Sequence, residues 1–112
     1  MKHVLSITLL CASLTASATE WAGTVVGISD GDTLTVLNSQ KKQVKIRMVE
    51  IDAPESKQAF GSQAKQSLSD LCFKKQAIVD DRGQDRYKRT LGRVTCEGVD
   101  ANAEQVKRGM GL

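Results

Sequence analysis

Short segments with strand patterning, separated by turns and interrupted by one helical window, constrain the fold of this chain more than any other feature. Five segments are rich in β-branched or alternating apolar residues and predict short strands, namely the two halves of 21–36, then 43–49, 77–79 and 91–95. The turn-forming run Ser29-Asp30-Gly31-Asp32 separates the first two. In the third, Lys45 and Arg47 alternate with apolar residues, so both cations are expected on the outer face of the sheet.

Residues 60–73 have helical spacing instead. Their apolar side chains recur at helical intervals and predict one amphipathic helix between the third and fourth strands. The charged residues 80–89 are expected to form the loop between the last two strands. Asn102 is expected to cap a short last helix that ends near Gly109.

This order of elements is an α+β pattern that is mainly β. In so small a domain an open sheet would leave its edge strands exposed, whereas a closed barrel has no free edges. The pattern therefore favours a five-stranded Greek-key barrel like the oligonucleotide-binding (OB) fold, with one inserted helix and a short C-terminal helix. Such a fold serves many functions, so the chemistry has to be inferred from particular residues.

The first 18 residues have the pattern of a signal peptide. A basic start is followed by the apolar stretch 4–14 and by Ala16-Ser17-Ala18, a small-residue cleavage box. The apolar stretch is too short to span a bilayer. We therefore expect residues 19–112 to form one exported domain, periplasmic or secreted, with no membrane insertion. Removal of Lys2 with the leader lowers the formal net charge from +3 to +2, which is only mildly basic.

The cysteines and the histidine restrict the possible chemistry. Cys11 leaves with the leader, and Cys72 and Cys96 remain in an oxidising compartment, where they either form a disulfide or stay as small buried thiols. The single histidine, His3, also lies in the leader. Cys/His zinc sites and Ser-His-Asp or Cys-His catalysis are therefore excluded. Carboxylates, arginines, tyrosine or a hard metal ion remain.

Two acidic motifs are the main candidates for a site, Asp30-Gly31-Asp32-Thr33 in the first turn and Ile51-Asp52-Ala53-Pro54-Glu55 after the third strand. If Asp32 and Asp52 converge, their repulsion requires a cation, and oxygen ligands favour Ca²⁺ or Mg²⁺ over zinc. Glu55 would then orient or deprotonate a water beside the metal. Each motif taken alone is also typical of ordinary turn or loop acids.

Arg47 and the loop Asp85-Arg86-Tyr87-Lys88-Arg89 supply cations, and phosphate is their natural target. A guanidinium group can bind two phosphate oxygens at once, and its positive charge offsets the negative charge of a pentacoordinate transition state. Tyr87 is suited to stacking on a base or to hydrogen bonding with a phosphate oxygen. The alternative is a solvated charged turn in which Tyr87 covers the end of the barrel.

Taken together and in order, these motifs resemble the staphylococcal nuclease (thermonuclease) family. The resemblance runs from about residue 23 to residue 110 and includes Lys45-Ile46-Arg47 and Asn102-Ala103-Glu104-Gln105-Val106. It implies a Ca²⁺-dependent endonuclease that acts on DNA and RNA and leaves 3′-phosphates, on a barrel of the expected type. We expect a monomer.

The resemblance also implies roles for particular residues. Asp32 and Asp52 match carboxylate ligands of Ca²⁺, with the backbone carbonyl of Ala53 as a further ligand. Glu55 matches the residue that positions or activates the attacking water.

The implied substrate contacts are cationic and aromatic. Arg47 and Arg89 match arginines that bind phosphate and stabilise the transition state. Arg86 and Tyr87 match positions that contact the terminal phosphate, and Lys88 adds charge that would help to hold it.

Three features depart from the family pattern. Lys88 stands where many members have glycine, which matters if that position requires a positive φ. Glu50 adds negative charge near the expected metal site, which would either tighten metal binding or repel substrate. The chain ends at Leu112, where relatives continue into an aromatic segment, so we expect a domain truncated at its C-terminus and less active.

The alternative function is a non-catalytic barrel that binds nucleic acid or a protein partner. Binding alone does not require a glutamate directed at a phosphate, so Glu55 beside the two aspartates favours the nuclease. A purely structural exported domain would not explain why these motifs occur together in this order along the chain.

Overall fold

The computed structural model describes residues 19–51, 53 and 60–111. The predicted signal peptide lies outside the described residues, and so do Asp52 and Glu55. No described helix is long and apolar enough to cross a membrane. The elements are β1 (Thr19–Asp30), β2 (Thr33–Leu37), β3 (Gln43–Met48), α1 (Gly61–Cys72), β4 (Gln76–Gln84), β5 (Thr90–Cys96), β6 (Val99–Asp100) and α2 (Ala101–Lys107).

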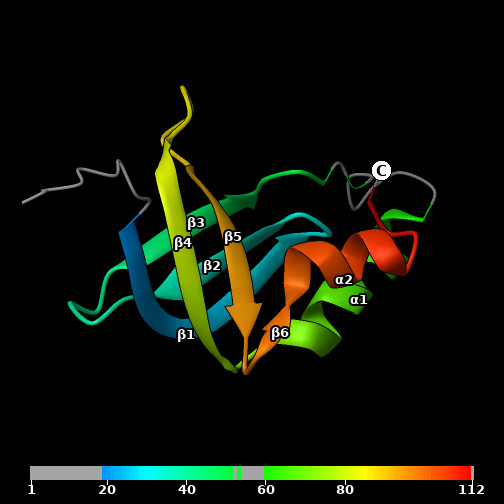
Figure 1. The fold of residues 1–112 in the computed structure, drawn as a ribbon, viewed down its shortest axis with the longest axis horizontal. Coiled ribbons are helices and arrows are strands. Elements are labelled where there is room, and N and C mark those ends of the chain that lie inside the picture. Colours follow the sequence, from blue (N-terminus) through cyan, green and yellow to red (C-terminus); the bar gives the residue numbers. More distant parts are fainter. Residues whose placement is uncertain (1–18, 52, 54–59, 112) are drawn as a thin grey trace, which may run out of the picture.

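The first five strands close into a barrel. Their order is β3-β2-β1-β4-β5, with the short β6 beside β5, and neighbouring strands in this order are antiparallel. A parallel pairing between β3 and β5 closes the barrel. Both helices lie side by side at one end of it (Figure 1). The predicted five-stranded barrel with an inserted helix and a short last helix is confirmed.

The core fills the barrel from the inner faces of the strands and from one face of α1. Alternation along β3 buries Ile46 and Met48, as its sequence pattern predicts. On α1 the residues Ala64, Leu68 and Leu71 face the barrel. The helix therefore covers the open end of the barrel at which the acidic turn lies.

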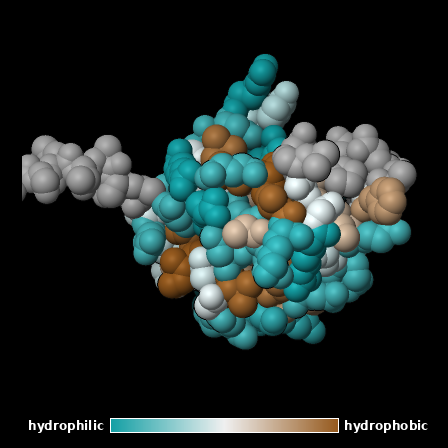
Figure 2. Space-filling view, turned by 45° about the vertical axis from the view of Figure 1, so that its right-hand side comes forward, coloured by the Kyte–Doolittle hydropathy of each residue, from teal (hydrophilic) through white to brown (hydrophobic). Residues whose placement is uncertain are grey.

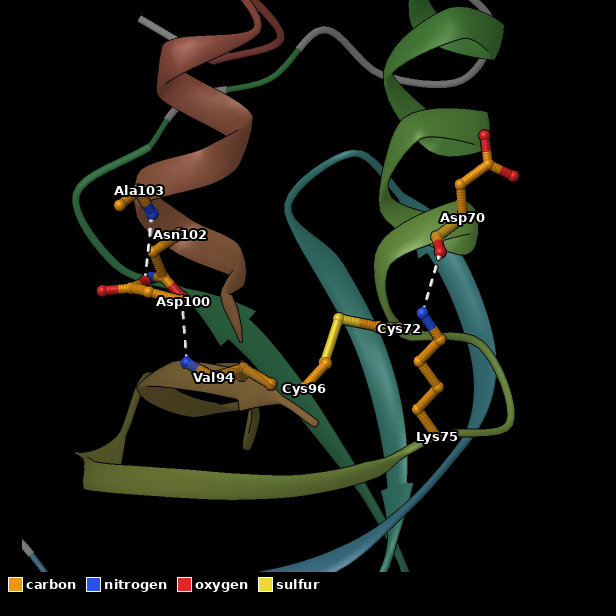
Figure 3. The surroundings of a disulfide bond; sticks show 8 residues. All are labelled: Asp70, Cys72, Lys75, Val94, Cys96, Asp100, Asn102 and Ala103. Carbon is orange, nitrogen blue, oxygen red and sulfur yellow. Dashed lines mark hydrogen bonds between the residues drawn. A yellow bond between two sulfur atoms is a disulfide. The ribbon is translucent and has the colours of Figure 1, made fainter. Parts of the chain in front are cut away.

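A disulfide joins Cys72 at the end of α1 to Cys96 at the end of β5, with the two Cα atoms 5.3 Å apart (Figure 3). Both cysteines are buried. Close to this bond the Nζ of Lys75 donates to the carbonyl of Asp70, 3.3 Å away. Two elements that are distant in the sequence are thus held together at the base of the helix.

The fourth strand is longer than its sequence pattern predicts. Residues 80–84, expected to begin a loop, continue β4 as far as Gln84. Asp81 pairs with Thr19 of β1, and Gln84 pairs with Thr90 of β5. Backbone pairing with β1 and β5 stabilises this part of the strand, although its side chains are largely exposed. A strand of this kind lacks apolar alternation and is therefore not predicted from the sequence pattern. The loop is reduced to residues 85–89.

The cap of the last helix was also predicted wrongly. Asp100 is the N-cap of α2, because its side chain accepts a hydrogen bond from the backbone N–H of Ala103 at 3.0 Å (Figure 3). Asn102 lies within the helix and is buried. Its amide accepts from the N–H of Val94 at 2.9 Å and donates to the carbonyl of Val49 at 2.7 Å. Asn102 therefore satisfies backbone groups of the barrel rather than of its own helix.

Candidate functional site

The acidic turn between β1 and β2 is pressed against helix α1. A Cβ atom added at Gly31 would lie 2.6 Å from the Cβ of Ala64 and 3.0 Å from the Cβ of Ala53. A larger residue therefore does not fit unless the backbone moves. Glycine here allows the turn to approach the helix, and this approach brings the next residue, Asp32, close to the segment that follows β3.

The carboxylate of Asp32 is held by three neighbours. Its Oδ1 accepts from the hydroxyl of Thr33 at 2.9 Å, and its Oδ2 accepts from the backbone N–H of Ala53 at 3.2 Å. The Nη1 of Arg47 lies 3.4 Å from Oδ2. Only 9% of the Asp32 side chain is exposed. The structure thus brings together Asp32, Arg47 and Ala53, three of the residues predicted for the site.

Arg47 also binds the backbone of the second acidic segment. Its Nη1 donates to the carbonyl of Met48 at 2.7 Å and to that of Ile51 at 3.1 Å. The side chain remains 24% exposed. The arginine is therefore oriented next to Asp32 by the carbonyl groups of Met48 and Ile51, and part of its side chain is exposed.

The donor atoms of this region suit a hard cation. The described part of the chain contains no group of three His, Cys, Asp or Glu residues that could hold a metal ion. Asp32 is the one proposed carboxylate ligand within it, and the roles of Asp52 and Glu55 stay predictions. Cys72 and Cys96 are joined as a disulfide and the described residues contain no histidine, so the described part of the chain offers no thiolate or imidazole ligand. Oxygen donors fit Ca²⁺ or Mg²⁺.

Asp85 organises the loop between β4 and β5. Its Oδ1 accepts from the backbone N–H of Tyr87 at 2.8 Å and of Arg89 at 3.0 Å, and its Oδ2 accepts from the Nε of Arg89 at 2.9 Å. Lys88 adopts a φ of 66°, in the left-handed region that favours glycine. A positive φ is thus required at this position, and lysine adopts it while the Asp85 bonds hold the loop closed. This role of Asp85 was not predicted from the sequence, although an aspartate at the start of a short loop is a known signal for such a turn.

Tyr87 does not cover the end of the barrel. Its side chain is 69% exposed at the tip of the β4–β5 hairpin. The guanidinium carbons of Arg86 and Arg89 lie 5.6 Å and 5.5 Å from the centre of its ring. The hairpin projects upward in Figure 1, and Figure 2 shows hydrophilic residues over its tip. An exposed ring between two cations is suited to binding a base or a phosphate.

The parallel pairing places Arg47 of β3 beside β5, the strand that Arg89 precedes. Ile46 pairs with Thr90, and Arg47 pairs with Leu91. Arg89 immediately precedes Thr90, at the end of the loop before β5. The side chains of Arg89 and Arg47 are 32% and 24% exposed. Both side chains are therefore partly exposed, one on β3 and one just before the strand that pairs with it.

The charge of Glu50 is paired with two arginines. Its Oε1 lies 3.3 Å from the Nη1 of Arg82 and 3.0 Å from the Nη1 of Arg93. Arg93 also contacts Asp100 at 2.7 Å, and this hydrogen bond, against partial desolvation, raises the pKa of Arg93 above its ordinary value. Glu50 therefore belongs to a surface ion-pair network on the outside of β4 and β5.

The Asp85 bonds lead to a prediction about pH. Partial desolvation disfavours the charged carboxylate of Asp85. The backbone N–H groups of Arg89 and Tyr87 and the guanidinium of Arg89 outweigh this effect and hold the pKa of Asp85 below its ordinary 3.8. Because the folded-state pKa is lowered, the bonds are fully present above about pH 4 and are lost as the pH falls through the lowered pKa. A carbon NMR titration of the carboxyl group should give a midpoint below 3.8, and Arg89→Ala should raise it. A midpoint at or above 3.8 in the unmodified chain would contradict the prediction.

The chain is similar in sequence to a known protein family and to several known proteins. Residues 45–112 match the family model described as staphylococcal nuclease homologue. The chain is 51% identical over 86 residues to an uncharacterized endonuclease of Haemophilus influenzae, a match covering 77% of this chain and 48% of that protein. It is 48% identical over 111 residues to protein ParB of Escherichia coli, covering 88% and 62%. A micrococcal nuclease of Shigella flexneri is 45% identical over 119 residues, covering 98% and 67%. The chain thus spans from about half to two thirds of the length of these relatives.

Proposed function

Because this chain belongs to the staphylococcal nuclease family, we propose that it is a Ca²⁺-dependent endonuclease that hydrolyses phosphodiester bonds of DNA and RNA. Nucleases of this family are generally metal-dependent. The observation that carries the proposal is the buried carboxylate of Asp32, held beside the partly exposed guanidinium of Arg47 and the backbone of Ala53. A carboxylate that can bind a metal ion and a guanidinium group that can bind phosphate are both useful for phosphodiester hydrolysis.

In this proposal Asp32, Asp52 and the carbonyl of Ala53 hold the metal ion. All three are oxygen donors, which suits Ca²⁺. When bound, the ion supplies a positive charge that polarises the phosphodiester group. The pairing of Arg47 with Asp32 holds the carboxylate in place next to Ala53. Ile51, whose carbonyl accepts from Arg47, immediately precedes Asp52 in the sequence.

The remaining roles belong to residues that move a proton or bind phosphate. Glu55 accepts a proton from water as the water oxygen forms a bond to phosphorus. The bond from phosphorus to the 5′-oxygen breaks, the leaving oxygen takes a proton from solvent, and the phosphate stays on the 3′-oxygen. Arg47 and Arg89 offset the negative charge that builds up on the phosphate oxygens.

The β4–β5 hairpin is proposed to bind the substrate beside the scissile bond. Arg86, Tyr87 and Lys88 lie at its tip, where Tyr87 is exposed and Arg86 packs over its ring. An aromatic face among cations binds single strands with little sequence preference. We further propose that the chain is exported through its signal peptide and acts as a monomer.

The test is nucleic-acid digestion by the mature protein in Ca²⁺ and in a Ca²⁺ chelator, followed by analysis of the product ends. Cleavage of both DNA and RNA that requires Ca²⁺ and leaves 3′-phosphates is the expected result. Cleavage that continues in the chelator would refute the metal mechanism. Binding of single strands without cleavage under any divalent metal would support the non-catalytic binding barrel instead.

A further inference from the structure

Gln105 on helix α2 is a polar side chain that the proposed mechanism does not use. It is fully buried, with an exposure of 0%. Its Nε2 donates to the carbonyl of Gly31 at 2.8 Å and to that of Ala64 at 3.1 Å, and its Oε1 accepts from the hydroxyl of Ser67 at 2.6 Å. Both N–H groups of the amide are therefore used, and one side chain joins α2, α1 and the acidic turn.

The bond to Gly31 acts directly on the candidate metal ligand. The carbonyl of Gly31 belongs to the peptide group that leads into Asp32. On the other side of the same residue, the carbonyl of Asp32 accepts from the N–H of Met48 at 2.8 Å. The backbone of Asp32 is thus held from both flanks, by α2 on one side and by the end of β3 on the other. Without the Gln105 bond, the Gly31 carbonyl would lose this partner, and of these two flanking bonds only the Met48 bond to the Asp32 carbonyl would remain.

We propose that Gln105 is a positioning residue for the metal site, which sets the orientation of Asp32 through the Gly31 carbonyl. This inference rests on the proposed function as far as Ca²⁺ is concerned. The bond spans 74 positions of the sequence, so it forms only after α2 docks. Some groups orient a metal ligand without binding the metal themselves. Removing such a group commonly lowers metal affinity by about 10- to 100-fold.

The hydrogen bonds of Gln105 also explain why an amide is tolerated at this buried place. A buried amide without partners costs free energy, and here each polar atom of the amide has a partner. Ser67, which donates to Gln105, in turn accepts from the Nη1 of Arg108 at 3.2 Å. The chain of bonds therefore runs from the surface of α2 through α1 to the acidic turn.

The experiment compares Gln105→Met, which keeps the length of the side chain but removes its donors, with two controls. Ser67→Ala removes the bond at the Oε1 end and leaves the Gly31 contact intact. Val79→Ala destabilises the buried core of β4 without touching the turn. Ca²⁺ affinity is measured by titration calorimetry, and exchange of the Met48 amide, which bonds to Asp32, is measured by NMR.

Gln105→Met is expected to raise the Kd for Ca²⁺ about tenfold and to accelerate Met48 exchange beyond the change in global stability. Ser67→Ala should leave the Kd within about twofold, as should Val79→Ala. An unchanged Kd in Gln105→Met, or Met48 exchange no faster than in Val79→Ala at equal stability, would overturn the proposal.

Failure of the proposed function gives a different result. If the unmodified protein binds no Ca²⁺, the metal mechanism is refuted, and Met48 exchange alone then decides whether Gln105 orients the turn. If Gln105→Met does not fold, Gln105→Asn gives the same comparison, because its amide is one methylene too short to keep the present contact with Gly31.

Discussion

Replacing Asp32 with asparagine should lower kcat/KM for nucleic-acid cleavage about a thousandfold at a fixed Ca²⁺ concentration. The metal ion supplies several kcal/mol of transition-state stabilisation, and about 4 kcal/mol corresponds to a factor of about a thousand. Asparagine keeps the shape and one acceptor oxygen, but it removes the charge that would attract the cation. Thr33 and Ala53 donate to different oxygens of the carboxylate, so asparagine keeps an acceptor for only one of them, but it changes the shape of the side chain least.

The measurement is a steady-state cleavage assay over a range of Ca²⁺ concentrations, with thermal unfolding as a check on folding. Asp70→Asn is a suitable control because it removes the same charge from an exposed position of α1. It should retain the activity of the unmodified chain. Activity of Asp32→Asn within tenfold of the unmodified protein would show that Asp32 does not bind the metal.

Loss of the Cys72–Cys96 disulfide should destabilise the domain by about 3 kcal/mol. The bond closes a loop with a sequence separation of 24, and in the chain-entropy model loops of this size contribute about 3 to 4 kcal/mol. A domain of this size should then lose about 15 °C in Tm. The contribution matters because a small barrel has a limited core.

The measurement compares Tm in the unmodified chain, the reduced chain and the Cys72→Ala/Cys96→Ala double variant. Alanine is preferred to serine because both positions are buried, and a hydroxyl there would add an unsatisfied polar group. A thiol count under non-reducing conditions provides the control. Two free thiols in the mature protein, or equal Tm values in all three samples, would contradict the prediction.

Much of the architecture was predictable because it depends on local patterns. Alternation along 43–48 places Ile46 inside the barrel and Arg47 outside, as expected. The run Asp30-Gly31-Asp32 predicts a tight turn, and β1 and β2 pair across it through Asp30 and Thr33. Helical spacing from Phe60 onward predicts α1 to within one residue at each end. In each case neighbouring residues carry the signal, so side-chain periodicity is sufficient.

The predictions that were wrong concern segments in which contacts with distant residues override the local sequence pattern. Residues 80–84 look like a loop, but pairing with β1 and β5 makes them a strand. Asn102 looks like a cap, but the backbone N–H of Val94 and the carbonyl of Val49 bind its side-chain amide. Local propensities do not reveal these interactions, because the interacting residues meet only when the barrel has closed.

The acidic turn shows the same division within the candidate site. The residue types of Asp32, Arg47 and Arg89 indicate metal and phosphate chemistry from the sequence, since oxygen donors and guanidinium groups have fixed chemical preferences. Their arrangement depends on contacts between remote segments: Gly31 against Ala64, and Gln105 bound to the Gly31 carbonyl across 74 positions. Chemical identity is a property of each residue and can be read along the chain. Orientation is a property of packing, and it exists only once β1, α1 and α2 are brought together.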